Sequence, residues 1–318
     1  MIERVDGGIV GRYFSGSWER LRMDKVGVEK VDRIPWLDRP GYRDLIRQKK
    51  LAGQIDEEGA EACTFFAEEG YLIVSGLIDS SQLDLAWESY EDFYQRNRGQ
   101  FFESPISEDP WPERYLNPHN CLPEIREILE HSSLLHITDM IFGRKTRPFQ
   151  TITSHKGTEQ PAHSDSIHMT TDPPGYLTAA WIAFEDLQPD CGLLEYYPRS
   201  HRLPYLLSDD VGIEGGEFQE QNYDVYKRSY EPAVAKLIEQ NGLESKLFQG
   251  RKGDVLFWHA NLLHGGGWRK DFQRSRKSLV CHYFSEEARL YHDLSGLPAH
   301  FGGEAGVGIE PLFKHETR

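Results

Sequence analysis

The sequence predicts a mainly β protein, an antiparallel sandwich or barrel with flanking helices. From residue 146 onward, short runs rich in β-branched and aromatic residues alternate with turns that contain Gly or Pro, which is typical of antiparallel strands. The first half of the chain instead contains longer segments with helix-capping residues. The clearest strand runs are 149–153, 177–184, 193–197, 255–258 and 278–284.

The elements expected in the first half are mostly helical. A helix is predicted from Asp56 to Gly70, because Asp56 can cap its N-terminus and Gly70 can adopt the left-handed conformation that ends helices. The further expectations, in chain order, are a strand at 71–75, a helix that begins at 79–82, a long irregular loop at 97–120 and a helical stretch at 122–142 that ends at Gly143.

Two segments lie outside this pattern. Residues 1–55 are polar and mixed in charge, and we interpret them as an N-terminal extension of short elements in which Trp36 and Leu37 can pack onto the core. Residues 208–245 form a long insertion between strands, with a helix expected at 231–241. The chain has no internal repeat, so we interpret residues 1–318 as a single domain with these two additions.

Composition excludes several classes of function. A formal net charge of −15 argues against a surface for nucleic acid or an anionic membrane. The sequence contains no apolar run long enough to cross a bilayer, and its N-terminus lacks the apolar region of a secretory signal. The four cysteines are far apart and form no C-x-x-C motif, so a reduced, cytoplasmic protein is expected. Nothing in the sequence indicates the oligomeric state.

The triplet His163-Ser164-Asp165 is the first candidate for chemistry. On a strand, alternate side chains share a face, so His163 and Asp165 would point to one side and both can bind one metal ion. By itself the triplet also fits a surface turn with a solvated Asp. A third ligand is therefore needed to favour a metal site.

His264 and Arg276 supply the remaining pieces. His264 closes a strand-like segment beside a run of glycines, and Arg276 follows twelve residues later at the start of the next strand. Two His and one carboxylate leave open positions on a metal, which suits a non-haem Fe(II) oxygenase. The rigid guanidinium fork of Arg276 matches a carboxylate, as a dicarboxylate co-substrate would require.

Several segments together resemble the phytanoyl-CoA dioxygenase family of Fe(II)/2-oxoglutarate-dependent oxygenases. The resemblance covers roughly residues 60 to 285, and its most specific part is the close, from Gly253-Asp254 through His264-Gly265 to Arg276-Lys277. It implies a double-stranded β-helix, which is a cupin-like jelly roll, with helices packed outside. The other matching segments are 65–74, 163–165, 181–186 and 191–201.

The resemblance implies roles for the candidate residues. His163, Asp165 and His264 would be the catalytic ligands of Fe(II), with His264 favoured over the nearby His259. Arg276 would pair with the far carboxylate of the co-substrate 2-oxoglutarate, with O2 as the oxidant.

The resemblance also indicates weaker candidates. Trp181 is expected at the pocket wall near the co-substrate. Residues Gln150, Thr151 and Thr153 lie on a strand that contributes a co-substrate contact in relatives, and the sequence does not choose among them. His168 is either a substrate-side pocket residue or a surface residue.

Two positions depart from the family pattern. Arg199 stands where relatives commonly have Gly, which affects a turn. Gly266 stands where some relatives have a Ser that contacts the co-substrate, so that contact is expected to be missing.

The function that the resemblance implies is hydroxylation of an unactivated C–H bond of a small-molecule metabolite, with release of succinate and CO2. The same iron centre also supports desaturation, epoxidation or cyclisation. A halogenase is disfavoured because Asp165 is present. A non-catalytic jelly roll that binds a metal or ligand is the alternative from another class, and a Zn or Mn enzyme of the cupin type would not need Arg276.

Overall fold

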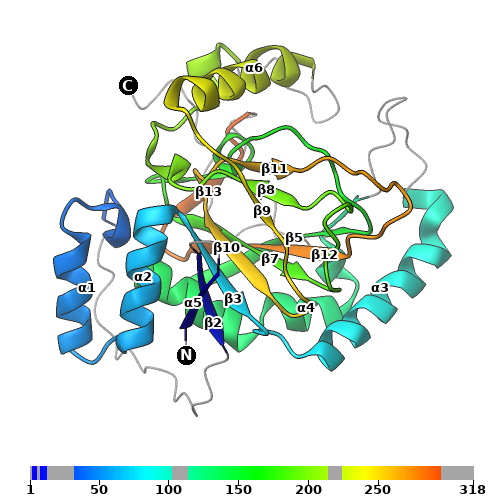
Figure 1. Cartoon of the computed structure of the whole chain (residues 1–318), viewed down its shortest axis with the longest axis horizontal. Coiled ribbons are helices and arrows are strands. Elements are labelled where there is room, and N and C mark those ends of the chain that lie inside the picture. The colour runs from blue at the N-terminus through cyan, green and yellow to red at the C-terminus, as the bar shows by residue number, and fades with distance from the viewer. Residues whose placement is uncertain (1, 6–7, 13–31, 102–113, 214–223, 295–318) are drawn as a thin grey trace.

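The computed structural model describes residues 2–5, 8–12, 32–101, 114–213 and 224–294 and centres on one large sheet (Figure 1). All neighbouring strands in it are antiparallel except β2 and β3, which are parallel. In spatial order its eight strands are β1 (Ile2–Val5), β2 (Gly8–Arg12), β3 (Tyr71–Ser75), β10 (Val255–His259), β7 (Leu177–Ala183), β12 (Ser278–Ser285), β5 (Thr146–Ser154) and β4 (Arg114–Leu116).

Two smaller sheets complete a double-stranded β-helix, as the family resemblance implies. One has the order β11 (His264–Gly266), β8 (Leu194–Tyr196) and β9 (Lys246–Phe248), and the other pairs β13 (Arg289–Tyr291) with β6 (Thr170–Asp172). Side chains of β8 and β9 pack against β3, β7 and β10 in one apolar cluster. The three-stranded sheet therefore lies over one face of the large sheet, and the space between them is the interior of the jelly roll.

Helices cover the opposite face of the large sheet. A second apolar cluster joins that face to α1–α5, whereas α6 lies on the far side, beyond the three-stranded sheet (Figure 1). The helices are α1 (Tyr42–Leu51), α2 (Glu57–Glu69), α3 (Ser80–Phe101), α4 (Pro123–Leu129), α5 (Ser132–Phe142) and α6 (Asp224–Asn241). Short 3-10 turns are η1 (Trp36–Asp38), η2 (Pro118–Asn120), η3 (Asp165–Ile167), η4 (Ser200–Arg202) and η5 (Asp209–Val211).

The register of the large sheet decides which side chains face the interior. Directly paired residues share a face, and the row of partners that contains Trp258, Ala179, His282 and Gln150 faces the interior. The next row along, which includes Cys281, faces the helices.

Several expectations are confirmed. The five predicted strand runs are β5, β7, β8, β10 and β12, and the strand at 71–75 is β3. Asp56 caps α2 by accepting a hydrogen bond of 2.7 Å from the Gly59 N–H, and Gly70 ends the helix with φ of 81°. Trp36 and Leu37 from the N-terminal extension are buried in the core.

Other boundaries were wrong. Helix α3 continues to Phe101, and β4 and η2 occupy the end of the expected loop. Residues 102–113 of that loop lie outside the described residues. The expected helix at 122–142 is two helices, which break at Glu130 and His131. The helix of the insertion begins at Asp224, and Pro232 lies inside it. The early part of α6 packs through Tyr226 and Tyr230 in an apolar cluster, which local sequence signals do not reveal.

Candidate metal centre and co-substrate site

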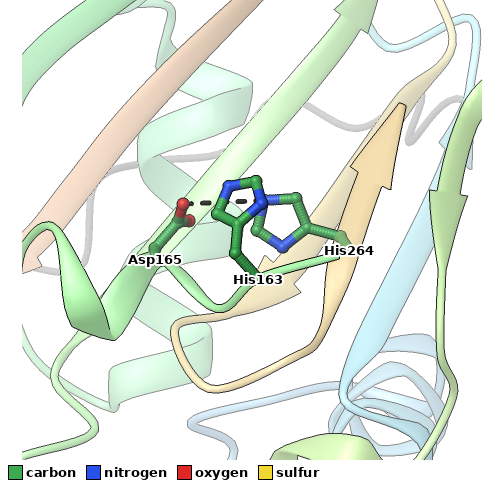
Figure 2. Close-up of side chains that lie close together, drawn as sticks. All are labelled: His163, Asp165 and His264. Carbon is green, nitrogen blue, oxygen red and sulfur yellow. Dashed lines mark ion pairs between the residues drawn. The ribbon is translucent and has the colours of Figure 1, made fainter. Parts of the chain in front are cut away.

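His163, Asp165 and His264 converge on one point (Figure 2). One ligand atom from each lies within 4.8 Å of the others, and all three side chains are buried. Among the described residues, these three form the group of His, Cys, Asp and Glu side chains whose ligand atoms lie close enough together to hold one metal ion. The arrangement brings together the three residues that the sequence proposes as ligands.

The reason for this convergence differs from the predicted one. His163 and Asp165 do not lie on a regular strand: Asp165 begins the turn η3, and His163 forms an isolated bridge with His264. In that bridge each of the two His residues donates its backbone N–H to the other's carbonyl oxygen, both at 2.9 Å. The main chain therefore holds two of the three ligands side by side, and the η3 turn brings in the carboxylate.

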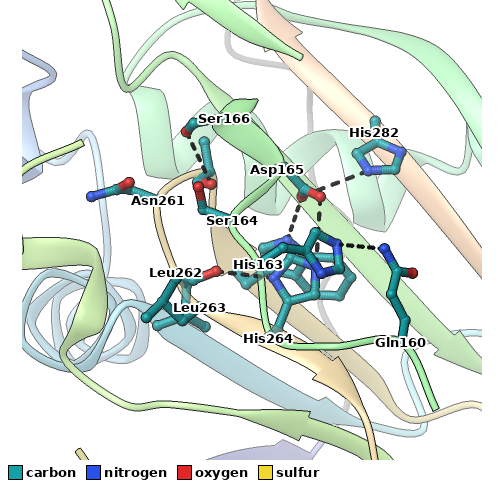
Figure 3. Close-up of polar contacts among 12 residues, drawn as sticks. Gln160, His163, Ser164, Asp165, Ser166, Asn261, Leu262, Leu263, His264 and His282 are labelled. Atoms are coloured by element: carbon teal, nitrogen blue, oxygen red, sulfur yellow. Dashed lines mark hydrogen bonds and ion pairs between the residues drawn. The ribbon is translucent and has the colours of Figure 1, made fainter. Parts of the chain in front are cut away.

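Both His rings are held in the tautomer that a metal needs. Nδ1 of His163 lies 3.0 Å from the carbonyl oxygen of Pro161. Nδ1 of His264 lies 2.9 Å from the carbonyl oxygen of Leu262 (Figure 3). Because Nδ1 must donate to these oxygens, Nε2 of each ring carries the lone pair. The amide nitrogen of Gln160 lies 3.3 Å from Nε2 of His163, consistent with that lone pair.

The carboxylate of Asp165 is oriented by groups on the large sheet. The indole Nε1–H of Trp258 donates to its Oδ2 at 2.6 Å. Nε2 of His282 lies 3.7 Å from the same oxygen (Figure 3). Oδ1 is turned toward Nε2 of His264, at 3.5 Å. One oxygen is thus fixed by the protein, and the other faces the ligand cluster.

The protonation states also suit a metal. Burial opposes the charge on Asp165, but His264, His282 and His163 together hold the pKa of its carboxyl below the usual range. Burial, with His264 and His168 nearby, lowers the pKa of His163 well below its ordinary value. An ionised carboxylate with neutral imidazoles is the ligand set that a divalent first-row metal requires, so these residues fit iron.

Arg276 is buried without a carboxylate partner. It is 3 % exposed, and its Nη1 donates to the carbonyl oxygen of Gly192 at 3.0 Å. Nε has no hydrogen-bond partner, and no described carboxylate lies within ion-pair distance of the guanidinium. Burial lowers its pKa to about 10. Because burying an unpaired charge is costly, the site is suited to receive an anion.

Trp181 lies beside this guanidinium. The Arg276 Cζ atom is 5.5 Å from the centre of the Trp181 ring, and Trp181 is on the interior face of β7, paired with Val280. The structure therefore brings Trp181 and Arg276 together.

The three candidates on β5 separate by face. Gln150 pairs with His282 on the interior side, and its Oε1 is buried without a hydrogen-bond partner. Thr151 and Thr153 pair with Cys281 and Leu279, which face the helices. Thr153 therefore points away from the interior, and we correct its expected place beside the co-substrate.

Two further histidines, His259 and His168, differ in their relation to the ligand cluster. His259 lies away from the ligand cluster, with its Nε2 3.2 Å from Asp38. His168 is half-buried, and its ring centre is 5.6 Å from that of His163 and 5.2 Å from that of Tyr226. His168 thus lies next to the metal ligands, as expected for a pocket residue.

The two departures from the family pattern have structural explanations. Arg199 adopts a left-handed conformation, with φ of 71°, at the position where relatives have Gly. A Cβ atom on Gly266 would lie 2.6 Å from the backbone nitrogen of Glu159. The close approach of these two chain segments leaves no room for a Ser side chain.

Sequence reasoning missed the residues that surround the ligands. Trp258 and His282 are predicted from the sequence only as members of the strands at 255–258 and 278–284. Both face the interior in one row of the large sheet, with Ala179 between them. The alternation of faces along β10 and β12 is therefore the signal that could have found them.

A jelly roll with an internal cluster of two His and one Asp, and with a buried Arg against the interior residue Trp181, is typical of non-haem iron oxygenases. The family model for phytanoyl-CoA dioxygenase (PhyH) matches residues 66–275. The chain belongs to the phytanoyl-CoA dioxygenase family and is a non-haem iron dioxygenase that depends on 2-oxoglutarate.

Phytanoyl-CoA dioxygenases of two mammals are similar to this chain in sequence. The peroxisomal phytanoyl-CoA dioxygenase of Homo sapiens is 22% identical over 286 residues, which cover 80% of each chain. The rat enzyme (Rattus norvegicus) is 30% identical over a shorter stretch, 42% of this chain and 36% of that protein.

Solved structures share the fold. The carbocyclase SnoK of nogalamycin biosynthesis matches with a TM-score of 0.56 and 18% identity over 75% of this chain and 87% of its own. EctD from S. alaskensis, in a structure with 2-oxoglutarate and 5-hydroxyectoine, matches with a TM-score of 0.56 and 16% identity over 76% and 79%. At 18% and 16% identity, these two structures bear on the fold alone. In the described residues, no helix combines the length and the apolar character needed to span a bilayer.

Proposed function

We propose that this enzyme hydroxylates an unactivated C–H bond of a small-molecule metabolite, with Fe(II) held by His163, Asp165 and His264. The single observation that carries the proposal is the pairing of this buried triad with a buried guanidinium, Arg276, that has no described carboxylate partner. A metal site alone would not need such a cation. A dicarboxylate co-substrate that binds the metal at one end would meet it at the other.

When bound, iron and 2-oxoglutarate supply the activation of O2 for oxidation of the substrate, with release of succinate and CO2. The residues of the chain supply the arrangement. Both imidazoles offer Nε2 because their Nδ1–H groups are engaged by carbonyl oxygens, and Asp165 offers the oxygen that Trp258 leaves free.

The co-substrate would be positioned by two interior residues. Arg276 can form two parallel hydrogen bonds with a carboxylate, and the indole of Trp181 shields that ion pair from water. Gln150, on the same face, offers an amide with an unpaired oxygen for a further polar contact. His168, next to the ligands, is our candidate on the substrate side.

Desaturation, epoxidation and cyclisation remain alternatives at the same centre, because the position of the substrate's hydrogens decides the outcome. Among the proteins that share the fold are a carbocyclase and an epimerase, SnoN. A jelly roll that binds without turnover is disfavoured, because the ligand set and the Arg are all in place. We also propose that residues 1–318 act as one oxygenase domain, in the cytoplasm, where the four free cysteines would stay reduced.

The test is an anaerobic titration of the purified protein with Fe(II) and then 2-oxoglutarate, followed by visible absorption. We expect a weak charge-transfer band from the chelate. It should disappear in Asp165→Ala and His264→Ala, which lose a ligand. If wild-type protein bound iron but gave no band with 2-oxoglutarate, the role of Arg276 and the proposed reaction would be wrong.

A further inference from the structure

Helix α6 of the insertion reaches the turn that carries the metal ligands. The hydroxyl oxygen of Tyr230 lies 3.1 Å from the backbone nitrogen of Ser164 and 3.3 Å from its Oγ. Tyr230 is fully buried, and Ser164 is 1 % exposed. This contact joins residues that are 66 positions apart in the chain.

The position of Ser164 makes this contact important. It is the residue between His163 and Asp165, where the chain leaves the backbone bridge and enters η3. A buried backbone N–H needs an acceptor, and the Tyr230 hydroxyl provides it. Because that oxygen accepts the N–H, its own proton is free to be donated to Ser164 Oγ.

Packing holds α6 close to both ligand segments. Tyr230 shares an apolar cluster with Ile167, which belongs to η3, and with Leu263, which directly precedes His264. Tyr226, one turn earlier on α6, stacks on Tyr230 with ring centres 5.0 Å apart. The helix therefore touches the chain beside each metal-binding segment.

We propose that Tyr230 is a positioning residue, through which the insertion sets the orientation of the turn that carries His163 and Asp165. The inference rests on the proposed function only in that the ligands bind Fe(II). It assigns a task to residues 208–245 that the family resemblance leaves open. Without the hydroxyl, the turn would lose the acceptor of its central N–H, and the two ligands on either side would be held less tightly.

The test compares Tyr230→Phe with Tyr283→Phe. Tyr283 is also fully buried, and its hydroxyl donates to the carbonyl oxygen of Leu129 at 2.8 Å, on the helix side of the sheet. Both variants lose one buried hydroxyl. Anaerobic calorimetry with Fe(II) should show about tenfold weaker binding for Tyr230→Phe, since outer-shell partners of metal ligands typically contribute that much. Tyr283→Phe should bind as the wild type does.

Two further measurements separate positioning from simple stability. With Co(II) in place of iron, the visible d–d spectrum should change in Tyr230→Phe and not in Tyr283→Phe, because it reports ligand geometry. A double variant, Tyr230→Phe with Ser164→Ala, should bind Fe(II) no more weakly than Tyr230→Phe alone. The contact of the Ser164 hydroxyl is with the Tyr230 hydroxyl, so it is already lost in Tyr230→Phe.

Equal Fe(II) affinity and an unchanged Co(II) spectrum in folded Tyr230→Phe would overturn the inference while leaving the proposed function intact. If wild-type protein bound no Fe(II), this inference and the proposed function would both be wrong. Should Tyr230→Phe not fold, hydrogen exchange of the wild type decides: amides at 224–241 should exchange more slowly with Fe(II) bound. Unchanged exchange there would also overturn the inference.

Discussion

Replacement of Trp258 by Phe should weaken iron binding although Trp258 is not a ligand. The indole N–H donates to Oδ2 of Asp165 at 2.6 Å in a site where Trp258 is 2 % exposed and Asp165 is 5 % exposed. A buried hydrogen bond to a charged group contributes about 1.5–3 kcal/mol. At about 1.4 kcal/mol for each factor of ten, the dissociation constant for Fe(II) should rise by about 10- to 100-fold.

The acid limit of iron binding should move as well. The pKa of Asp165 lies below its usual range in the folded protein. Loss of a donor that favours the carboxylate raises this pKa. Because the metal requires the ionised form, Fe(II) binding by Trp258→Phe should fall away at a higher pH than binding by the wild type.

Anaerobic calorimetry with Fe(II) measures the effect, and Trp36→Phe is the matched control. Trp36 is 7 % exposed and its indole donates to the carbonyl oxygen of Ile141 at 2.8 Å, in the helical layer. Both variants lose a buried indole hydrogen bond, so both should be less stable. A dissociation constant for Trp258→Phe within twofold of the wild type would refute the claim that this indole orients the ligand.

Three further predictions concern the co-substrate, the glycine run and pH. Arg276→Ala should raise the dissociation constant for 2-oxoglutarate on the order of 100-fold, as the visible band would report, with Fe(II) affinity unchanged; an equal loss of both would contradict a role specific to the co-substrate. Gly266→Ser should lower the free energy of unfolding by about 1–3 kcal/mol in a denaturant titration, because its Cβ would clash with Glu159; an unchanged midpoint would show that the segments can part. Burial lowers the pKa of His119 to about 4 and that of His201 to about 3, so below pH ~6.5 the unfolded chain binds more protons than the folded protein. Each His should therefore lower the free energy of unfolding by up to about 2 kcal/mol as the pH falls from 7.5 to 5. A denaturant midpoint that stays constant over that pH range would contradict this.

Local sequence signals were sufficient to predict some helices and strands and to identify the candidate metal ligands. The capped helix at 57–69 and the strand at 71–75 follow from Asp56, Gly70 and the apolar run between turns, and the structure has both. The ligand triad was also identifiable, because two His and one Asp at these positions form a set with a clear chemical purpose.

The contacts that surround the triad could not be predicted, because alternation along a strand indicates which side chains face the interior but not which distant segment they meet. Trp258 reaches Asp165 across 93 positions, and Tyr230 reaches Ser164 across 66. The choice between Gln150 and Thr153 needed the register of β5 against β12, which one sequence does not reveal. Helix α3 likewise extends to Phe101 in spite of Gly99 in its last turn.

The backbone bridge between His163 and His264 has a consequence for how such enzymes can diversify. The main chain fixes the separation of these two ligands, so the connections between the strands that lie between them can vary in length as long as the chain returns to the bridge. An added helix such as α6 can therefore enter this stretch while the bridge keeps the two His ligands together. New substrate pockets can be built on an unchanged reactive centre, which makes this interval the natural place for engineering altered selectivity.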